Sequence, residues 1–148
     1  MANKYWEDFK VNDKWETIRI TITPAHLVIW AGLSGDFYPL HMDEEFAKKT
    51  IFGGRIVHGP LIFGMSIGLV AMTGIFEDSI IAWLGIENMR IPVPVKLGDT
   101  IGTEVAVKEK RSTKNPARGI TIFTYTVKNQ RGETVMLFDC MHLMHRRS

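Results

Sequence analysis

Cysteine is almost absent from this sequence. Cys140 is the only cysteine among 148 residues, so no disulfide can form within one chain, and a structural zinc site built on several cysteines is excluded. A chain of this length can bury enough surface to fold without such a staple. The scarcity of cysteine fits a reducing compartment, and we therefore expect a cytoplasmic protein.

An excess of charge of either sign is also missing. The 18 basic residues nearly balance the 16 acidic residues, which leaves a net charge of +2. Binding of DNA or RNA needs a clustered basic face, whereas the basic end of this chain is short and contains only His142, His145, Arg146 and Arg147. We expect this end to be solvated, and we expect no nucleic-acid partner.

Charged residues are missing altogether between Arg55 and Glu77, a stretch that approaches the length of a membrane-spanning helix. Glycine and small polar residues interrupt this stretch, however, and His58-Gly59-Pro60 marks its start. A glycine-rich helix of this kind suits close packing against a sheet. We therefore expect a buried core helix and no membrane partner.

No linker, repeat or low-complexity tract divides the chain, so we expect one domain over residues 1–148. Helical signals dominate the first half and β-branched residues the second. In the short helix that starts at Asp43, Glu44 and Lys48 have the spacing of a favourable pair. An antiparallel sheet that buries one long apolar helix is the simplest arrangement, which is an α+β fold. Besides the short helix, we expect a helix at 24–33 and the long apolar helix from 59 to about 74. The strands are expected at 15–23, 80–91, 100–110, 119–129 and 133–145.

Several common catalytic motifs are absent. The sequence has no H-E-x-x-H zinc motif, no Walker A phosphate loop and no G-x-S-x-G nucleophile elbow. His142 and His145 are three residues apart on an expected strand, so their side chains point to opposite faces. These two histidines cannot share a metal ion there, and we expect no metal site.

The segment 34–41 holds one carboxylate, Asp36, and one imidazole, His41, in an expected nonhelical loop. An acid and a base brought together can hold a water molecule and move protons. The start of a helix at Gly59 presents unpaired N–H groups that can bind a polarised carbonyl oxygen. From spacing alone a second interpretation stays open, in which Asp36 caps a turn and His41 satisfies a buried carbonyl.

The order of several short motifs resembles one known family. The sequence contains Ser34-Gly35-Asp36, Pro39-Leu40-His41-Met42-Asp43, Arg55-Ile56-Val57-His58-Gly59 and Lys96-Leu97-Gly98-Asp99-Thr100. These motifs are similar to those of the MaoC-like dehydratases, also called R-specific enoyl-CoA hydratases or hydratase 2. The resemblance covers about residues 10–145.

The resemblance implies a hot-dog fold, in which an antiparallel sheet wraps a long central helix, and a homodimer or a higher oligomer of dimers. It implies reversible syn hydration of a trans-2-enoyl thioester to an (R)-3-hydroxyacyl thioester. Asp36 and His41 would be the catalytic pair that holds the water, and the Gly59 amide would polarise the thioester oxygen. No metal or redox cofactor is implied, since the CoA or pantetheine thioester is part of the acyl-CoA substrate.

Four further residues are candidates for substrate binding: Tyr38, Arg55, His58 and Phe63. The family usually has Asn where this sequence has Tyr38, and a phenol cannot reproduce the paired donor and acceptor of an amide. Arg55, like Lys96 or Arg118, could meet CoA phosphates. Phe63, with Met65, Met72 and Phe76, either lines an acyl tunnel or packs in the core.

Two other functions stay open on the same scaffold. One is a noncatalytic protein that binds or senses acyl thioesters, since a fold does not determine a function. The other is a hot-dog thioesterase, although such enzymes generally carry a helix-borne acid rather than the Asp36 and His41 loop.

Overall fold

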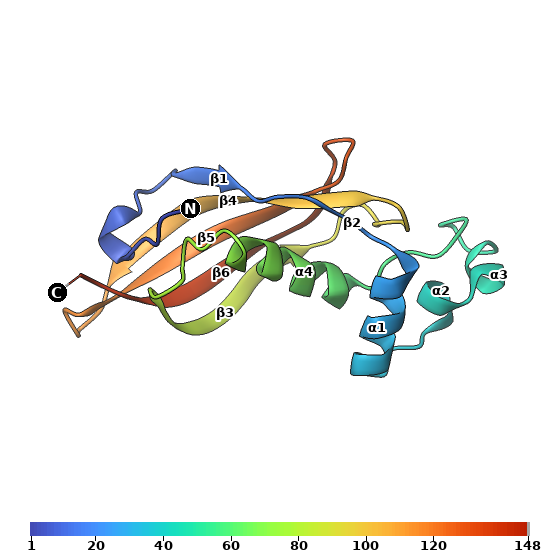
Figure 1. Ribbon diagram of the computed structural model, residues 1–148, viewed down its shortest axis with the longest axis horizontal. Coiled ribbons are helices and arrows are strands. Elements are labelled where there is room, and N and C mark those ends of the chain that lie inside the picture. Colours follow the sequence, from blue (N-terminus) through green and yellow to red (C-terminus); the bar gives the residue numbers. More distant parts are fainter. Residues whose placement is uncertain (148) are drawn as a thin grey trace.

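The structure is a computed structural model that describes residues 1–147. An antiparallel six-stranded sheet and one long helix form its centre. The strands follow the order β1-β4-β5-β6-β3, and β2 also pairs with β4 (Figure 1). The elements are η1 (Trp6–Asp8), β1 (Lys14–Glu16), β2 (Ile20–Thr21), α1 (Pro24–Ser34), α2 (Pro39–Met42), α3 (Glu44–Ala47), α4 (Gly59–Ala71), β3 (Ile80–Arg90), β4 (Thr100–Ser112), β5 (Arg118–Lys128) and β6 (Thr134–His145).

The core lies between α4 and one face of the sheet. Alternate residues of the long strands point toward the helix, and these include the fully buried Val105, Phe123 and Cys140. The helix contributes buried residues at positions 61, 62, 66, 69 and 70, which follow the helical period. The predicted α+β arrangement is therefore confirmed.

Two of the glycines of α4 do not face the sheet. Gly64 and Gly68 lie on the exposed side of the helix, with no atom within 4 Å of the place where a Cβ would be. The expectation that they allow a close approach to the sheet is therefore wrong for this chain. The helix also ends at Ala71 rather than near Gly74, which adopts a left-handed turn with φ +69°.

The first half of the chain differs from the expected elements in two places. The expected strand 15–23 is split into β1 and β2, both paired with β4. Residues 39–41, expected to belong to a nonhelical loop, lie in the single turn of α2, Pro39–Met42. Helix α1 agrees with its prediction, since Pro24 is its first residue and Gly35 ends it in the left-handed conformation.

The ion pairs of the short helix α3 also differ. Asp43 caps it by accepting a hydrogen bond from the amide of Phe46, as its position predicted. Lys48, however, pairs with Glu45, and Glu44 pairs instead with Arg55 at 3.0 Å. The expected pair Glu44–Lys48 is therefore wrong, because a tertiary partner competes for the carboxylate.

The basic end of the chain is solvated at His145 and Arg147, as expected, and its two arginines are also held by ion pairs. Arg146 forms an ion pair with Glu7 and stacks on Trp6, while Arg147 pairs with Asp8. His142 is buried and His145 is exposed, so the prediction that they point to opposite faces is confirmed. Within residues 1–147, no helix has the length and apolar character that a membrane span requires.

His142 is the most unusual residue of the core. Its side chain packs against the rings of Phe76 and Phe123, whose centroids are 5.8 Å and 5.7 Å away. Burial lowers the pKa of His142 to about 4 from an ordinary value of 6.5. The folded protein therefore keeps this imidazole neutral at pH values where the unfolded chain protonates it.

We expect this burial to make the protein acid-labile between pH 6.5 and about pH 4. Across this interval only the unfolded chain takes up the proton, so the free energy of unfolding falls as the pH falls, by up to about 3 kcal/mol. The variant His142→Phe should lose this part of the pH dependence, which urea denaturation at pH 7 and pH 4.5 would measure. His145→Phe, on the exposed face of the same strand, is the control and should keep it. An equal pH dependence in both variants would contradict the assignment.

Candidate active site

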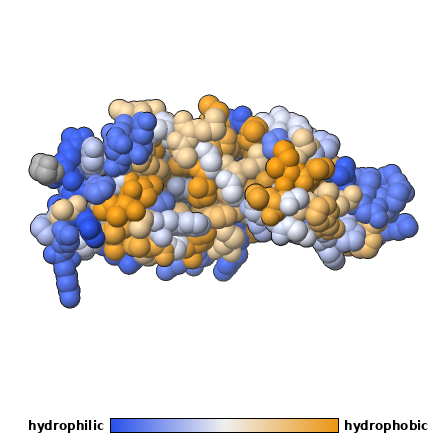
Figure 2. All heavy atoms as spheres, turned by 60° about the horizontal axis from the view of Figure 1, so that its bottom comes forward, coloured by the Kyte–Doolittle hydropathy of each residue, from blue (hydrophilic) through white to orange (hydrophobic). Residues whose placement is uncertain are grey.

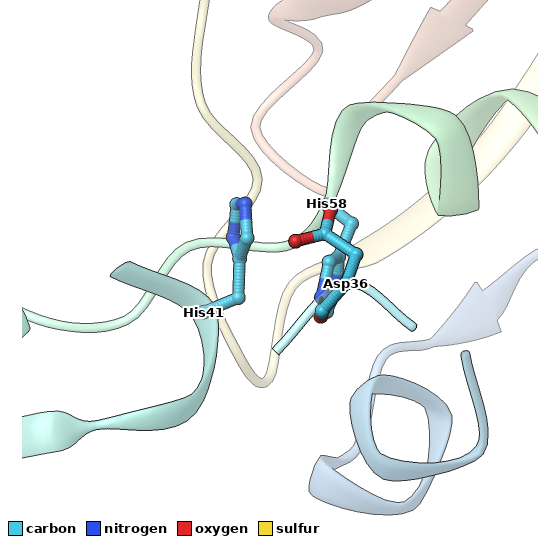
Figure 3. A group of neighbouring side chains, drawn as sticks. All are labelled: Asp36, His41 and His58. Atoms are coloured by element: carbon cyan, nitrogen blue, oxygen red, sulfur yellow. Dashed lines mark hydrogen bonds between the residues drawn. The ribbon is translucent and has the colours of Figure 1, made fainter. Parts of the chain in front are cut away.

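Three polar side chains meet where α4 begins. Asp36 follows α1, His41 lies in α2, and His58 is the residue just before α4. One potential ligand atom of each lies within 4.8 Å of those of the other two. Figure 3 shows the Asp36 carboxylate turned toward the imidazole of His41.

Local turns hold Asp36 in place. Gly35 adopts φ +80°, which reverses the chain after α1. The Asp36 amide then donates to the Ser34 hydroxyl at 3.2 Å, and the Asp36 carboxylate accepts a hydrogen bond from the Tyr38 amide at 3.3 Å. The second interpretation of the sequence, a turn-capping aspartate, therefore describes part of its role, and one carboxylate oxygen is left for other contacts.

The orientation of His41 is determined by a backbone carbonyl. Nδ1 of His41 lies 2.8 Å from the carbonyl oxygen of Ile56. A carbonyl oxygen only accepts, so Nδ1 must carry the proton, and in the neutral ring Nε2 then has a free lone pair. His41 thus satisfies a buried carbonyl, as one interpretation held, and this contact also prepares its other nitrogen to act as a base.

His58 is buried and contacts both Asp36 and His41. It has no exposed surface, its Nε2 donates to the Asp36 carbonyl oxygen at 3.0 Å, and its ring stacks on that of His41 with centroids 4.1 Å apart. Burial lowers the pKa of His58, and the neighbouring His41 ring lowers it further. Its side chain is therefore a neutral positioning group, and the expectation that it contacts substrate does not fit this geometry.

The first residue of α4 completes the site. Gly59 has an amide at the N-terminal end of the helix, where the helix dipole is positive, and the next residue, Pro60, has no amide hydrogen. A Cβ at Gly59 would lie 3.1 Å from Cδ1 of Ile91. The absence of a side chain therefore relieves crowding at this position while the amide stays available to an oxygen atom.

Asp36 and His41 are close enough to hold one water molecule between them. Two hydrogen bonds of about 2.8 Å that meet at a tetrahedral oxygen place their outer atoms about 4.6 Å apart. A carboxylate oxygen of Asp36 and a ring nitrogen of His41 lie within 4.8 Å of each other, a limit that admits this value. The carboxylate oxygens and the Nε2 lone pair are hydrogen-bond acceptors.

The same three residues are the group within 1–147 that could hold a metal ion. Two of their ring nitrogens are already committed, since His41 Nδ1 and His58 Nε2 each donate to a carbonyl oxygen. The ring nitrogens left with a free lone pair are His41 Nε2 and His58 Nδ1, which has no hydrogen-bond partner within residues 1–147. The Asp36 carboxylate and His41 Nε2 are thus free for acid–base chemistry.

The remaining predicted residues surround this group to different degrees. The Tyr38 ring is 57% exposed and lies 6.2 Å from the His41 ring. Phe63 follows Gly59 by one helical turn on the same side of α4, and it stacks on Trp83. Arg55 is close in sequence but is engaged by Glu44.

Two contributors to the site could not be identified from the sequence. These are the Ile56 carbonyl, which orients His41, and the hydroxyl of Ser34, which accepts from the Asp36 amide. A backbone carbonyl leaves no signal in residue type. The serine was part of the quoted motif, but nothing in its spacing indicated a contact.

Comparison with known sequences places the chain in a family. The family model described as a MaoC-like domain matches residues 8–129. Protein MaoC of Klebsiella aerogenes is 41% identical over 107 residues, which cover 72% of this chain but only 31% of that protein. An (R)-specific enoyl-CoA hydratase of Aeromonas caviae is 36% identical over 102 residues, covering 69% of this chain and 73% of that enzyme.

Comparison with solved structures supports the same family. A monoamine oxidase regulatory protein from Archaeoglobus has a TM-score of 0.92 at 35% identity, covering 99% of this chain and 97% of that one. A Mycobacterium tuberculosis protein described as a double hotdog fold has a TM-score of 0.86 at 17% identity over 98% of this chain and 45% of that one, a likeness of fold alone. The hot-dog fold implied by the motifs is confirmed, and this chain belongs to the MaoC-like domain family.

Proposed function

We propose that the protein is an (R)-specific enoyl-CoA hydratase, which adds water reversibly to a trans-2-enoyl thioester. The observation that carries this proposal is the cluster of Asp36 and His41 beside the start of α4, in which polar atoms of the two side chains lie within 4.8 Å of each other and the Nε2 lone pair of His41 is left free. A hydratase relative at 36% identity supports the same reaction class.

In this proposal the two acceptors orient the water. The water donates one hydrogen bond to Asp36 and one to His41 Nε2, so an oxygen lone pair points at C3 of the substrate. Asp36 takes the proton as the new C–O bond forms, and His41 orients the water and shares in the transfer of a proton to C2. Because one pair serves both carbons from one side, the addition is syn.

The Gly59 amide has a separate part in the reaction. As water attacks C3, negative charge moves to the thioester oxygen, and an N–H group at a helix start stabilises that charge. The reaction adds the elements of water across a double bond and changes no oxidation state overall. It therefore needs no redox cofactor, and the CoA or pantetheine group comes with the substrate.

One assay separates this function from its two alternatives. With crotonyl-CoA, a hydratase removes the enoyl absorbance without releasing free thiol and forms (R)-3-hydroxybutyryl-CoA. Release of thiol would instead identify a thioesterase. No change with crotonyl-CoA or longer enoyl-CoA substrates would favour a binding or regulatory role, and the (S) product would contradict the assignment of the site.

The catalytic pair provides a second test. We expect Asp36→Asn and His41→Ala each to lower kcat by about 10²-fold or more, since positioned acid–base groups supply about 10²–10⁴-fold. Asparagine can still accept from the Tyr38 amide, so Asp36→Asn should leave the melting temperature nearly unchanged. His41→Ala leaves the Ile56 carbonyl unpaired and should cost about 1–3 kcal/mol.

Steady-state hydration and a thermal melt of each variant measure these effects. The double variant should be far less than multiplicatively worse, because both groups act on one water molecule. Asn129→Ser, a polar change in the distant β5–β6 hairpin, is a control for general destabilisation. Near-normal turnover in either single variant would rule out the proposed mechanism.

We also propose that the chain works as a homodimer. Large apolar side chains are exposed on the helical end that carries the site, and hydrophobic surface gathers there in Figure 2. They include Val28, Ile29, Leu33, Phe37 and Phe46. Exposed apolar patches of this kind usually mark contact with another protein surface.

Strand β3 offers a second unpaired surface. It lies at the sheet edge with β6 as its only strand neighbour within residues 1–147, and it exposes Trp83 and Leu84. We expect light scattering at micromolar concentration to give the mass of at least two chains. A stable monomer under these conditions would contradict this prediction.

A further inference from the structure

Two exposed cations near the start of α4 have no acidic partner. Arg90 is the last residue of β3, and Lys96 lies in the connection from β3 to β4. Neither side chain forms an ion pair with any residue from 1 to 147. The guanidinium of Arg90 donates only to the neighbouring carbonyl oxygen of Met89, at 2.8 Å. Both charges are therefore available to an anionic ligand.

Backbone contacts place Lys96 beside the catalytic histidine. The Val57 amide donates to the carbonyl oxygen of Val95 at 2.8 Å, and Ile56 faces Lys96 in an isolated antiparallel bridge. Residues paired in this way have Cα atoms about 4.5–5.5 Å apart. Ile56 is also the residue whose carbonyl oxygen orients His41. Lys96 therefore projects from the strip of backbone that borders the candidate site.

Arg90 is tied to the same place through the next residue. Cδ1 of Ile91 lies 3.1 Å from the position that a Cβ of Gly59 would occupy, so the end of β3 lies against the first turn of α4. The Gly59 amide is the group that polarises the thioester oxygen in the proposed reaction. The two cations thus stand at the two ends of the segment 91–95, which passes beside this amide.

The other basic residues suggested by the sequence are not available to the same ligand. Glu44 already holds Arg55 at 3.0 Å. Arg118 lies beside the end of β4 at Ser112, whereas Lys96 precedes the start of that strand. The 13 residues of β4 extend roughly 40 Å at about 3.3 Å per residue, so Arg118 is at the opposite end of the sheet.

The acidic residue of the same turn does not neutralise Lys96. Burial raises the pKa of Asp99, but hydrogen bonds from the Lys96 amide, Gln130 and Arg131 outweigh burial and hold this pKa below its usual value. Arg131 also balances the charge of Asp99, at 3.0 Å. Asp99 therefore fixes the backbone of the turn and leaves the Lys96 ammonium group for a ligand.

We propose that Lys96 and Arg90 bind the diphosphate of coenzyme A, and so select CoA thioesters as the substrates of this site. The proposal rests on the proposed hydratase function for the position of the thioester at Gly59. Arginine and lysine bind phosphate oxygens by charge-assisted hydrogen bonds. A diphosphate carries at least two negative charges, which match the two cations, whereas the phosphopantetheine of a carrier protein carries one phosphate.

The lengths on the two sides agree. The pantetheine arm that joins the sulfur to the diphosphate is about as long as an extended peptide of five residues, which is about 16–17 Å. Three residues separate Gly59 from Ile56, and the bridge to Lys96 adds about 5 Å, so the path between the Gly59 and Lys96 backbones is at most about 16 Å. A thioester at Gly59 therefore allows its phosphates to come within reach of the Lys96 side chain.

The test compares crotonyl-CoA with crotonyl-pantetheine, which has no phosphate group. We expect Arg90→Ala and Lys96→Ala each to raise the KM for crotonyl-CoA about fivefold, and the double variant about tenfold or more, with kcat nearly unchanged. The KM for crotonyl-pantetheine should stay the same in all three variants. The double variant Lys114→Ala/Arg118→Ala removes the same two residue types from the exposed far end of the sheet, and it should change neither KM.

An unchanged KM for crotonyl-CoA, or an equal rise with both substrates, would overturn the proposal. An equal rise in the Lys114→Ala/Arg118→Ala control would also overturn it, because the effect would then come from net charge alone. Crotonyl-phosphopantetheine, with the single phosphate that a carrier protein also presents, should show a smaller rise. A rise as large as that for crotonyl-CoA would overturn the choice of CoA.

Calorimetric titration with free CoA needs no turnover and separates this proposal from the hydratase function. Binding that weakens at least fivefold in the Arg90→Ala/Lys96→Ala variant, and not in the control, supports the phosphate site even if crotonyl-CoA is not hydrated. Binding that the variant leaves unchanged, or no binding of CoA by the wild-type protein, rejects it.

Discussion

The hydrogen bond from His58 to the Asp36 carbonyl oxygen is the contact on which the site depends most. The same imidazole stacks on His41 and belongs to the residue that precedes Gly59. One buried ring therefore fixes the acid, the base and the helix start relative to each other. Its depressed pKa keeps it neutral beside His41, so it adds no repulsion when His41 gains a proton. The cost is an unpartnered Nδ1 in the interior.

Elements with a strong local signal were predicted well from the sequence. Thr23-Pro24 and Gly35 determine the ends of α1 by their own backbone preferences, and the four long strands follow from β-branched and aromatic residues. The failures have tertiary causes. Pairing with β4 is confined to two short parts of the expected strand 15–23, and Arg55 takes the carboxylate that Lys48 was expected to bind. Neither outcome is encoded in the local sequence.

In the candidate site, too, the features with a local signal in the sequence could be predicted, and those that depend on the fold could not. Residue types and spacing pointed to Asp36, His41 and Gly59 but left a second interpretation open, and the resemblance to a family selected them; the structure brings them to one place. The protonated nitrogen of His41 could not be predicted, because it depends on the carbonyl of Ile56, fifteen residues away. The same limit applies to His58, since only the fold shows that its side chain is enclosed rather than open to substrate.

Some buried polar groups of this protein have all their hydrogen bonds satisfied, as in Asp139, and others have an atom without a partner, as in His142. The Asp139 carboxylate accepts hydrogen bonds from Lys108, Asn88 and Thr124 across four strands, and these donors outweigh its burial and lower its pKa. Such a satisfied group ties the sheet together and offers nothing to a ligand. His142 has no comparable set of donors and acceptors although it is equally buried. Because an unpaired buried polar atom destabilises the fold, His142 lowers the free energy of unfolding where the satisfied Asp139 raises it.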